Sequence, residues 1–220
     1  MELLVPVDPR GLVAREKVDI TNQRRSLLFG AFCNAGGVLM AATIALAATM
    51  EARTEVPSPQ TLEYRVKGAF LYNFAKFVDW PTNAFASAEA PFVIAVLGDE
   101  SVMQTLQQPV KGKSIGNRAT QVRWIADGAR IEPCQILFVA QSKTQQFTRI
   151  LAALGSAPVL LVGESPGFIA GGGAISFTND AGSVRFEINA AAAERAGLKI
   201  SSKLLRVATV VTPAPRDEGK

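Results

Sequence analysis

The sequence predicts an α/β fold, a mostly parallel sheet of about six strands flanked by helices, with a C-terminal antiparallel hairpin. Three observations indicate it. Short apolar runs such as FVIAVL and PVLLV alternate with helical stretches, as is typical of parallel strands covered on both faces. Near the C-terminus, the strand-like runs AISFT and SVRFEIN are separated only by NDAG, a turn-forming cluster. A hydrophobic content of 48% with 19% charged residues indicates a globular chain rather than a disordered one.

The first fifty residues predict export. Arg24 and Arg25 precede about 25 mostly apolar residues that end in small residues at Ala45 and Ala47, the pattern that a signal peptidase reads. We interpret residues 1–50 as a leader and signal peptide. An uncleaved inner-membrane anchor facing the periplasm is the alternative, because the run is long enough to span. In both cases the arginines remain cytoplasmic and the rest of the chain lies in the periplasm.

The remaining chain divides into three parts. Residues 51–60 contain the polar, proline-marked run RTEVPSPQ and are predicted to be a linker. Residues 61–210 are predicted to form one α/β domain, and residues 211–220 a disordered tail.

The aromatic stretch GAFLYNFAKFVDWP belongs to the first predicted helix. This helix begins near Thr61 and ends before Pro81, which disfavours helical backbone in the residue before it. Apolar residues at spacings of three and four predict one buried stripe. The stripe consists of Leu62, Val66, Ala69, Phe70, Phe74 and Phe77. Glu63 and Lys67 are predicted to pair on the opposite, wetter side.

The middle of the chain alternates strands with helices. Apolar runs of strand length and the alternating run TQVRWI predict four strands, and helical spacing predicts two helices. The expected strands are residues 92–97, 120–125, 134–140 and 158–162, and the expected helices are residues 101–107 and 144–154.

The C-terminal part of the chain has a different pattern from the alternating strands and helices before it. In the second strand of the hairpin Val184, Phe186 and Ile188 alternate with polar residues, so one face is wet. Asn189 can cap a helix over residues 190–196, and a last helix follows Ser201 and Ser202 to about residue 207. The preceding run of glycines at residues 171–173 is expected to be a flexible turn or bulge.

Residue usage argues against several chemistries. The chain contains no histidine, which removes the commonest general base and metal ligand, and no catalytic constellation or cofactor motif is recognisable. We therefore predict no enzyme activity, no cofactor and no metal. Once the leader is removed Cys134 is the one remaining cysteine, so it is expected to be an unpaired, buried strand thiol.

Basic residues do not form a nucleic-acid site. The densest group is Lys111, Lys113, Arg118 and Arg123, which is spread over a loop and a strand rather than along one face. We predict no nucleic-acid partner. A small-molecule site, if present, is expected at the carboxyl ends of the parallel strands, where Asp99, Ser142 and Glu164 are the candidate residues.

Several blocks in one order resemble the YfiR family of exported bacterial proteins, over residues 63–208. They are YRVKGAFLYNFAKFVDWP, FVIAVLGD, PCQILFVAQS, PVLLVGE, GGGAISF and VRFEINAAAAERAGLKISSKLLRVA. The resemblance implies a non-enzymatic periplasmic repressor, often a homodimer. It would bind the periplasmic region of an inner-membrane diguanylate cyclase and lower cyclic-di-GMP signalling. An OmpA-like outer-membrane lipoprotein is the implied second partner.

The chain departs from the repressors it resembles at one point. They carry a disulfide to the cysteine matching Cys134, whereas Ala95 occupies the plausible partner position here. For protein contacts we single out Tyr72 and Trp80, aromatic residues that core packing does not require, and Ser201 and Ser202, which are more than one helix cap needs. The alternative function is a periplasmic small-molecule-sensing module that acts on another envelope partner.

We expect the mature chain in the soluble periplasmic fraction, beginning between about residues 46 and 53, because cleavage follows the small residues of the apolar run. Fractionation and N-terminal sequencing check this. Recovery from membranes alone, at full length, would support the anchor instead.

Overall fold

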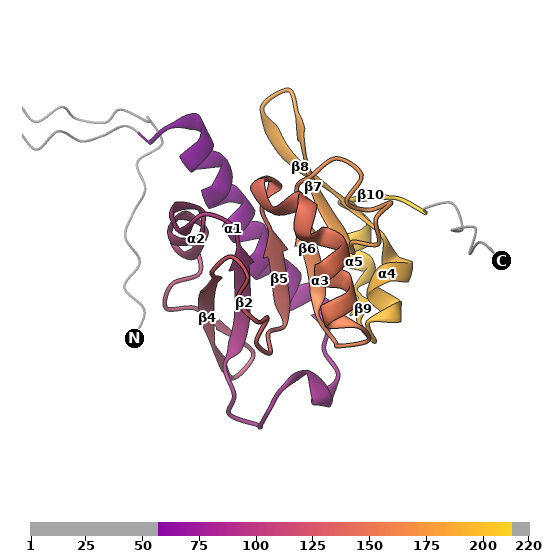
Figure 1. Ribbon diagram of the computed structural model, residues 1–220. Helices are drawn as coiled ribbons and strands as arrows, with labels where there is room; N and C mark the ends of the chain where they lie inside the picture. Colours follow the sequence, from indigo (N-terminus) through magenta and orange to yellow (C-terminus); the bar gives the residue numbers. More distant parts are fainter. Residues whose placement is uncertain (1–56, 213–220) are drawn as a thin grey trace, which may run out of the picture. The chain divides into compact units, whose positions relative to one another are not determined.

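The computed structural model describes residues 57–212, whose arrangement Figure 1 shows. The predicted leader, most of the predicted linker and most of the predicted tail lie outside the described residues. Helix α1 (Pro59–Phe77) begins two residues earlier than predicted. The Ser58 hydroxyl oxygen causes this start, because it accepts a hydrogen bond from the backbone N–H of Thr61 at 3.1 Å and caps the helix.

One mixed sheet of eight strands runs in the order β10-β8-β7-β6-β5-β2-β4-β3. The five central strands from β7 to β4 are parallel to their neighbours, and β8 pairs antiparallel with β7. The bounds are β2 (Phe92–Leu97), β3 (Ser114–Ile115), β4 (Arg118–Ile125), β5 (Ile136–Val139), β6 (Leu160–Gly163), β7 (Ile175–Asp180), β8 (Ser183–Ile188) and β10 (Thr209–Val210). The predicted fold class is confirmed. The sheet is wider than predicted because β3 and β10 have two residues each, too few for an apolar pattern.

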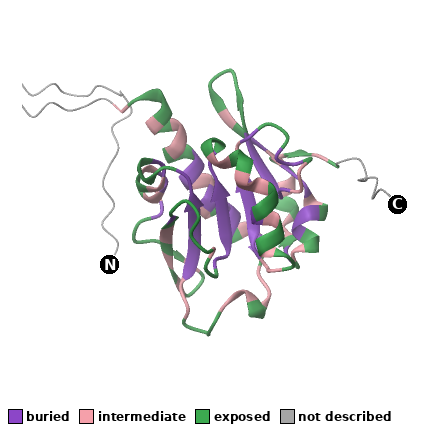
Figure 2. Cartoon of the chain, in the orientation of Figure 1, coloured by how far each residue is buried: buried purple, intermediate pink, exposed green. Residues whose placement is uncertain are grey.

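Helices cover both faces of this sheet unequally. On one face, called the α1 face, lie α1, α2 (Glu100–Gln107), α4 (Ala190–Arg195) and α5 (Ser202–Leu205). On the other, called the α3 face, α3 (Phe147–Leu154) packs after the 3-10 helix η2 (Gln141–Gln146). In β2 alternate residues enter the two cores, so every position is buried and the run is continuously apolar. Figure 2 shows this burial at the centre of the sheet.

A second, two-stranded sheet lies at the end of α1. Strand β1 (Val78–Asp79) pairs antiparallel with β9 (Lys199–Ile200). The 3-10 turn η1 (Thr82–Ala84) follows before the chain enters β2. This small sheet ties the end of α1 to the C-terminal part of the domain.

The buried face of α1 is rotated from the predicted stripe. Phe74 is buried as expected, but Leu62 and Val66 are 49% and 44% exposed. Lys67, predicted to lie on the wet side, is buried. The prediction was wrong there because the N-terminal half of α1 crosses the carboxyl edge of the sheet, where Lys67 meets a buried carboxylate instead of solvent.

The C-terminal half of α1 packs through aromatic rings. Phe74 lies 5.0 Å, centroid to centroid, from Phe186 in an edge-to-face contact, and 5.7 Å from Phe177. Phe70 lies 5.3 Å from Phe186. The aromatic residues of the first helix therefore anchor it to the β7–β8 hairpin, and aromatic pairs contribute about 0.5–1.5 kcal/mol each beyond area burial.

The glycine run has a packing reason. Phe168 is buried on the α3 face, and its ring occupies the space that a Cβ atom would take at Gly163 and at Gly173. The ring of Phe147 lies 4.6 Å from that of Phe168. The glycine at position 173, predicted as part of a flexible turn, therefore admits a core side chain.

Gly68 allows α1 and α2 to approach each other closely. A Cβ atom at this position would overlap the backbone oxygen of Leu106 and lie 2.8 Å from Cγ of Pro109. Within residues 57–212, no helix is long and apolar enough to cross a membrane.

We expect Gly68→Ala to destabilise the domain by about 1–3 kcal/mol, although alanine normally favours a helix, because the backbone of Leu106 cannot move aside. Urea unfolding measures the change. Asn73→Ala, on the exposed side of the same helix, is the control and should be neutral or slightly stabilising. Stabilisation by Gly68→Ala would contradict the close approach.

Candidate functional site

The candidate site lies where the chain direction over the sheet reverses. After β2 the chain passes to α2 on the α1 face, whereas after the neighbouring β5 it passes to η2 and α3 on the α3 face. Connections that leave to opposite faces open a crevice outside the carboxyl ends of parallel strands. A pocket of about 490 Å³ lies there, and the predicted candidates Asp99 and Ser142 both line it, with Tyr64 from α1.

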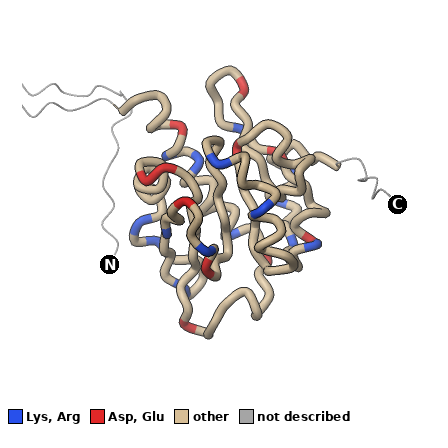
Figure 3. Tube along the Cα trace, viewed as in Figure 1, with Lys and Arg blue, Asp and Glu red and all other residues tan. Residues whose placement is uncertain are grey.

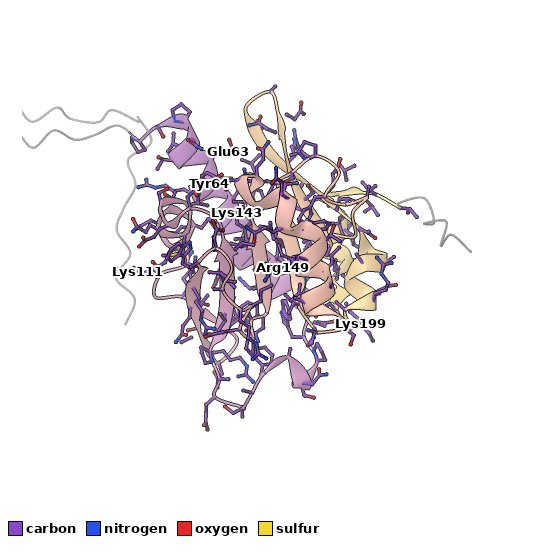
Figure 4. All side chains as sticks on the ribbon, viewed as in Figure 1. Glu63, Tyr64, Lys111, Lys143, Arg149 and Lys199 are labelled. Carbon is purple, nitrogen blue, oxygen red and sulfur yellow. The ribbon has the colours of Figure 1, made fainter. Side chains whose placement is uncertain are left out.

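A buried ion pair forms the core of this site. Nζ of Lys67 lies 2.5 Å from Oε2 of Glu164 and 2.5 Å from Oε1 of Glu63. The side chains of Lys67 and Glu164 are 7% and 6% exposed, whereas that of Glu63 is 32% exposed. Figure 4 labels Glu63 beside Tyr64 on α1. The ammonium group thus bridges one buried carboxylate at the end of β6 and one partly exposed carboxylate on α1.

The second oxygen of Glu164 is also satisfied. Its Oε1 accepts hydrogen bonds from the Tyr64 hydroxyl at 3.0 Å and from the backbone N–H of Gln141 at 2.9 Å. Next to it, the Ser165 and Thr144 hydroxyls share a hydrogen bond. Glu164 therefore joins α1, the end of β5 and the end of β6, which is the arrangement that a buried charge requires.

Tyr64 acts as a donor in this network. Burial, followed by the charge of Glu164, raises the pKa of Tyr64 above its ordinary value, so the phenol remains protonated at neutral pH. The ring also lies 4.9 Å from Nζ of Lys67, in cation–π range. Since the oxygens of Glu164 are occupied by donors, the network is suited to holding a polar pocket in shape.

Glu164 also borders a second hollow. This pocket of about 470 Å³ is lined by Glu164, Phe168, Phe177 and Glu187, among others. Tyr64 lines the first pocket and Glu164 the second, and the two side chains are hydrogen bonded. This hydrogen bond therefore links a side chain that lines one hollow to a side chain that lines the other.

Trp80, Ser201 and Ser202 lie at the other end of α1, around the small sheet. The ring of Trp80 packs edge-to-face on Phe92 at 5.1 Å, and its Nε1 donates to the backbone oxygen of Ala75 at 3.0 Å. Ser201 caps α5, since its hydroxyl oxygen accepts from the backbone N–H of Lys203 at 3.3 Å. Ser202 is exposed. Half-buried Trp80 is thus largely a packing residue, whereas Ser202 is open to contact.

Tyr72 stands apart from both groups. Its hydroxyl donates to the backbone oxygen of Ser114 at 3.1 Å, and Nζ of Lys113 lies 4.8 Å from its ring. The predicted residues therefore occupy three places: Asp99, Ser142 and Glu164 at the carboxyl edge, Trp80, Ser201 and Ser202 at the small sheet, and Tyr72 beside β3.

Sequence reasoning missed Tyr64 and Lys67. Both are in the block YRVK, and the Glu63–Lys67 pair was recognised, but as a solvated pair. The missed indication was that the first turns of α1 must cross the strand ends at which Glu164 was expected. Neither residue could be assigned to that edge without the direction of the helix.

Cys134 is a free, buried thiol. Burial raises its pKa to about 12, so it remains protonated and unreactive at neutral pH. Among residues 57–212 no group of His, Cys, Asp and Glu side chains is placed to hold a metal ion. Figure 3 shows positions of both charge signs interspersed along the trace.

These features define an α/β domain with a polar, structurally fixed pocket at its topological switch point. The YfiR/HmsC-like family model matches residues 64–209, and the chain belongs to this family. The family is a regulatory, non-catalytic one, and its context is periplasmic regulation in cyclic-di-GMP signalling. Comparison with curated proteins found no match.

We expect Lys67 and Glu164 to be strongly coupled. Glu164→Gln should lower the free energy of unfolding by about 3 kcal/mol, because removing one partner leaves a buried charge short of compensation. Adding Lys67→Met should then cost less than it does alone, by about 1–3 kcal/mol, in a double-mutant cycle followed by urea unfolding.

A surface pair supplies the control for this cycle. Glu132 lies 2.5 Å from Arg123 but its side chain is 65% exposed, so Glu132→Gln should change stability little. Additive effects of the two substitutions at Lys67 and Glu164 would show that the buried pair is not coupled.

Proposed function

We propose that this chain is a non-enzymatic periplasmic regulator that binds and represses the periplasmic region of an inner-membrane diguanylate cyclase. The observation that carries the proposal is the family match over residues 64–209, which spans nearly the whole described domain. Export through the leader that the sequence predicts at residues 1–50 would bring the domain to the compartment where such a cyclase exposes its periplasmic region.

The surface around the small sheet is the proposed cyclase contact. Asp79 and Lys199 lie opposite each other in the register of β1 and β9, and both are exposed. Ser202 follows at the start of α5 and is also exposed. The rigid support beneath them supports this choice, because Trp80 packs on Phe92 and the Ser201 backbone N–H donates to the oxygen of Phe77 at 2.8 Å. A preformed surface loses little conformational entropy on binding.

Further protein contacts follow from the family resemblance, namely a homodimer and an OmpA-like outer-membrane lipoprotein that would sequester the repressor. Leu62 and Val66 support a contact on α1. They lie one turn apart on the same side of the helix and are both exposed, so together they present apolar surface on α1.

A second candidate function is a small-molecule-sensing module that acts on another envelope partner. The pocket of about 490 Å³ at the switch point favours it, because open α/β sheets bind ligands at this position. A ligand bound there would raise the melting temperature of the purified protein in a concentration-dependent way.

Cellular cyclic-di-GMP in the native host tests the first function. Deleting the gene should raise its level, and the exported protein should restore it, whereas a version without residues 1–50 should not. Ser202→Arg should fail to restore repression, because an added charge and bulk at the proposed contact oppose docking. Thr148→Arg, also at an exposed position but on the α3 face, should restore it fully.

An unchanged cyclic-di-GMP level across several growth conditions would refute the repressor function. If deletion raises the level but Ser202→Arg restores it as well as the parent chain does, the function stands and the contact lies elsewhere. Equal loss with Thr148→Arg would instead point to a general effect of added charge.

A further inference from the structure

The α3 face is covered by less helix than the α1 face. Helix α3 packs over β5 and β6, but the connection from β4 to β5, residues 126–135, contains no helix. Parallel sheets are normally covered by helices on both faces. Over β2 and β4 this irregular segment therefore replaces the helix, with Ile131 packed against the core beneath it.

A cleft of about 880 Å³ lies between this segment and α3. Its inner wall includes Leu97, Ile125, Cys134, Ile150 and Val159, all of which are buried residues of the α3-face core. This volume is in the range of sites for small organic ligands, which are mostly apolar with a few convergent polar groups. The cleft is separate from the switch-point pocket, with which it shares no lining residue.

The charged side chains that line the cleft have a net positive charge. Arg130 from the connecting segment and Arg149 from α3 both line it, and neither forms an ion pair within the described residues. The one lining carboxylate, Glu132, is already paired with Arg123. Figure 4 labels Arg149 at α3. Two guanidinium groups therefore stand beside an apolar wall without an acidic partner.

We propose that this cleft binds a small amphipathic anion, with its apolar body against the partly exposed lining residues Ile131, Leu154 and Pro158 and its acidic group paired with the two arginines. Guanidinium groups bind carboxylate, sulfonate and phosphate groups through paired N–H donors. Binding is favourable because the apolar body of the ligand and these partly exposed side chains both lose contact with water. A fully polar anion could not provide this contribution. This site is independent of the proposed cyclase contact, which lies on other residues.

The probe for the test is 1-anilinonaphthalene-8-sulfonate, whose fluorescence rises in apolar surroundings. Its matched control is N-phenyl-1-naphthylamine, which has the same rings without the sulfonate. Titration of the purified protein should show one saturable site for the sulfonate. Decanoate should displace the probe, whereas decanol should displace it less well. Higher salt should weaken sulfonate binding, because the arginines are exposed.

Two variants separate the charge from the apolar wall. Arg149→Gln should weaken sulfonate binding about fivefold to tenfold, and leave binding of the uncharged analogue unchanged. Ala153→Trp, which places a large side chain at the cleft, should abolish binding of both probes. Arg195→Gln removes another exposed arginine, from α4 on the other face, and should have no effect.

The outcomes decide the proposal. Absence of saturable sulfonate binding to the parent protein would overturn it. So would equal weakening of both probes by Arg149→Gln, or equal weakening of sulfonate binding by Arg195→Gln. Near-ultraviolet circular dichroism confirms that each variant is folded, and if Ala153→Trp is not, the arginine substitutions still decide.

Discussion

The ion pair between Lys67 and Glu164 is the interaction on which the rest of the domain depends. It joins the first helix to the carboxyl edge of the sheet at a place where neither charge reaches solvent. Such a pair is stable only when every remaining donor and acceptor is satisfied. Here Glu63 accepts from Lys67, and Tyr64 and Gln141 donate to Glu164. With the helix fixed along its axis, its phenylalanines meet the rings of the hairpin two turns further on.

The two faces of the sheet follow from one topological choice. Because the chain leaves β2 and β5 in opposite directions, one crevice opens at their carboxyl ends, and the face that receives only α3 is left partly covered by irregular chain. The pocket at the switch point is polar and held by hydrogen bonds, whereas the cleft between residues 126–135 and α3 has an apolar wall and is bordered by arginines. A single domain thus presents chemically distinct surfaces without any long insertion.

The sequence predicts the structure well where every residue of a strand is buried. It does not predict which residues are buried where burial depends on a side chain far away along the chain. The buried strands could be predicted because each fully apolar run has one consistent reading, and Asp99, Ser142 and Glu164 could be assigned to one edge because strand direction determines where the ends meet. Lys67 could not be predicted as buried, because its environment is set by Glu164, nearly a hundred residues away. Leu62 and Val66 fit a helical stripe equally well, but the helix turns its polar side to the edge of the sheet.

The packing of Phe168 against Gly163 and Gly173 has an evolutionary consequence. Three positions separated along the chain share one volume, so a larger residue at either glycine is tolerated only if the aromatic ring has already become smaller. Conversely, loss of the ring leaves a void that neither glycine can fill alone. Single steps away from this combination pass through a less stable protein, and we expect diverging relatives to keep all three residues or to replace them together.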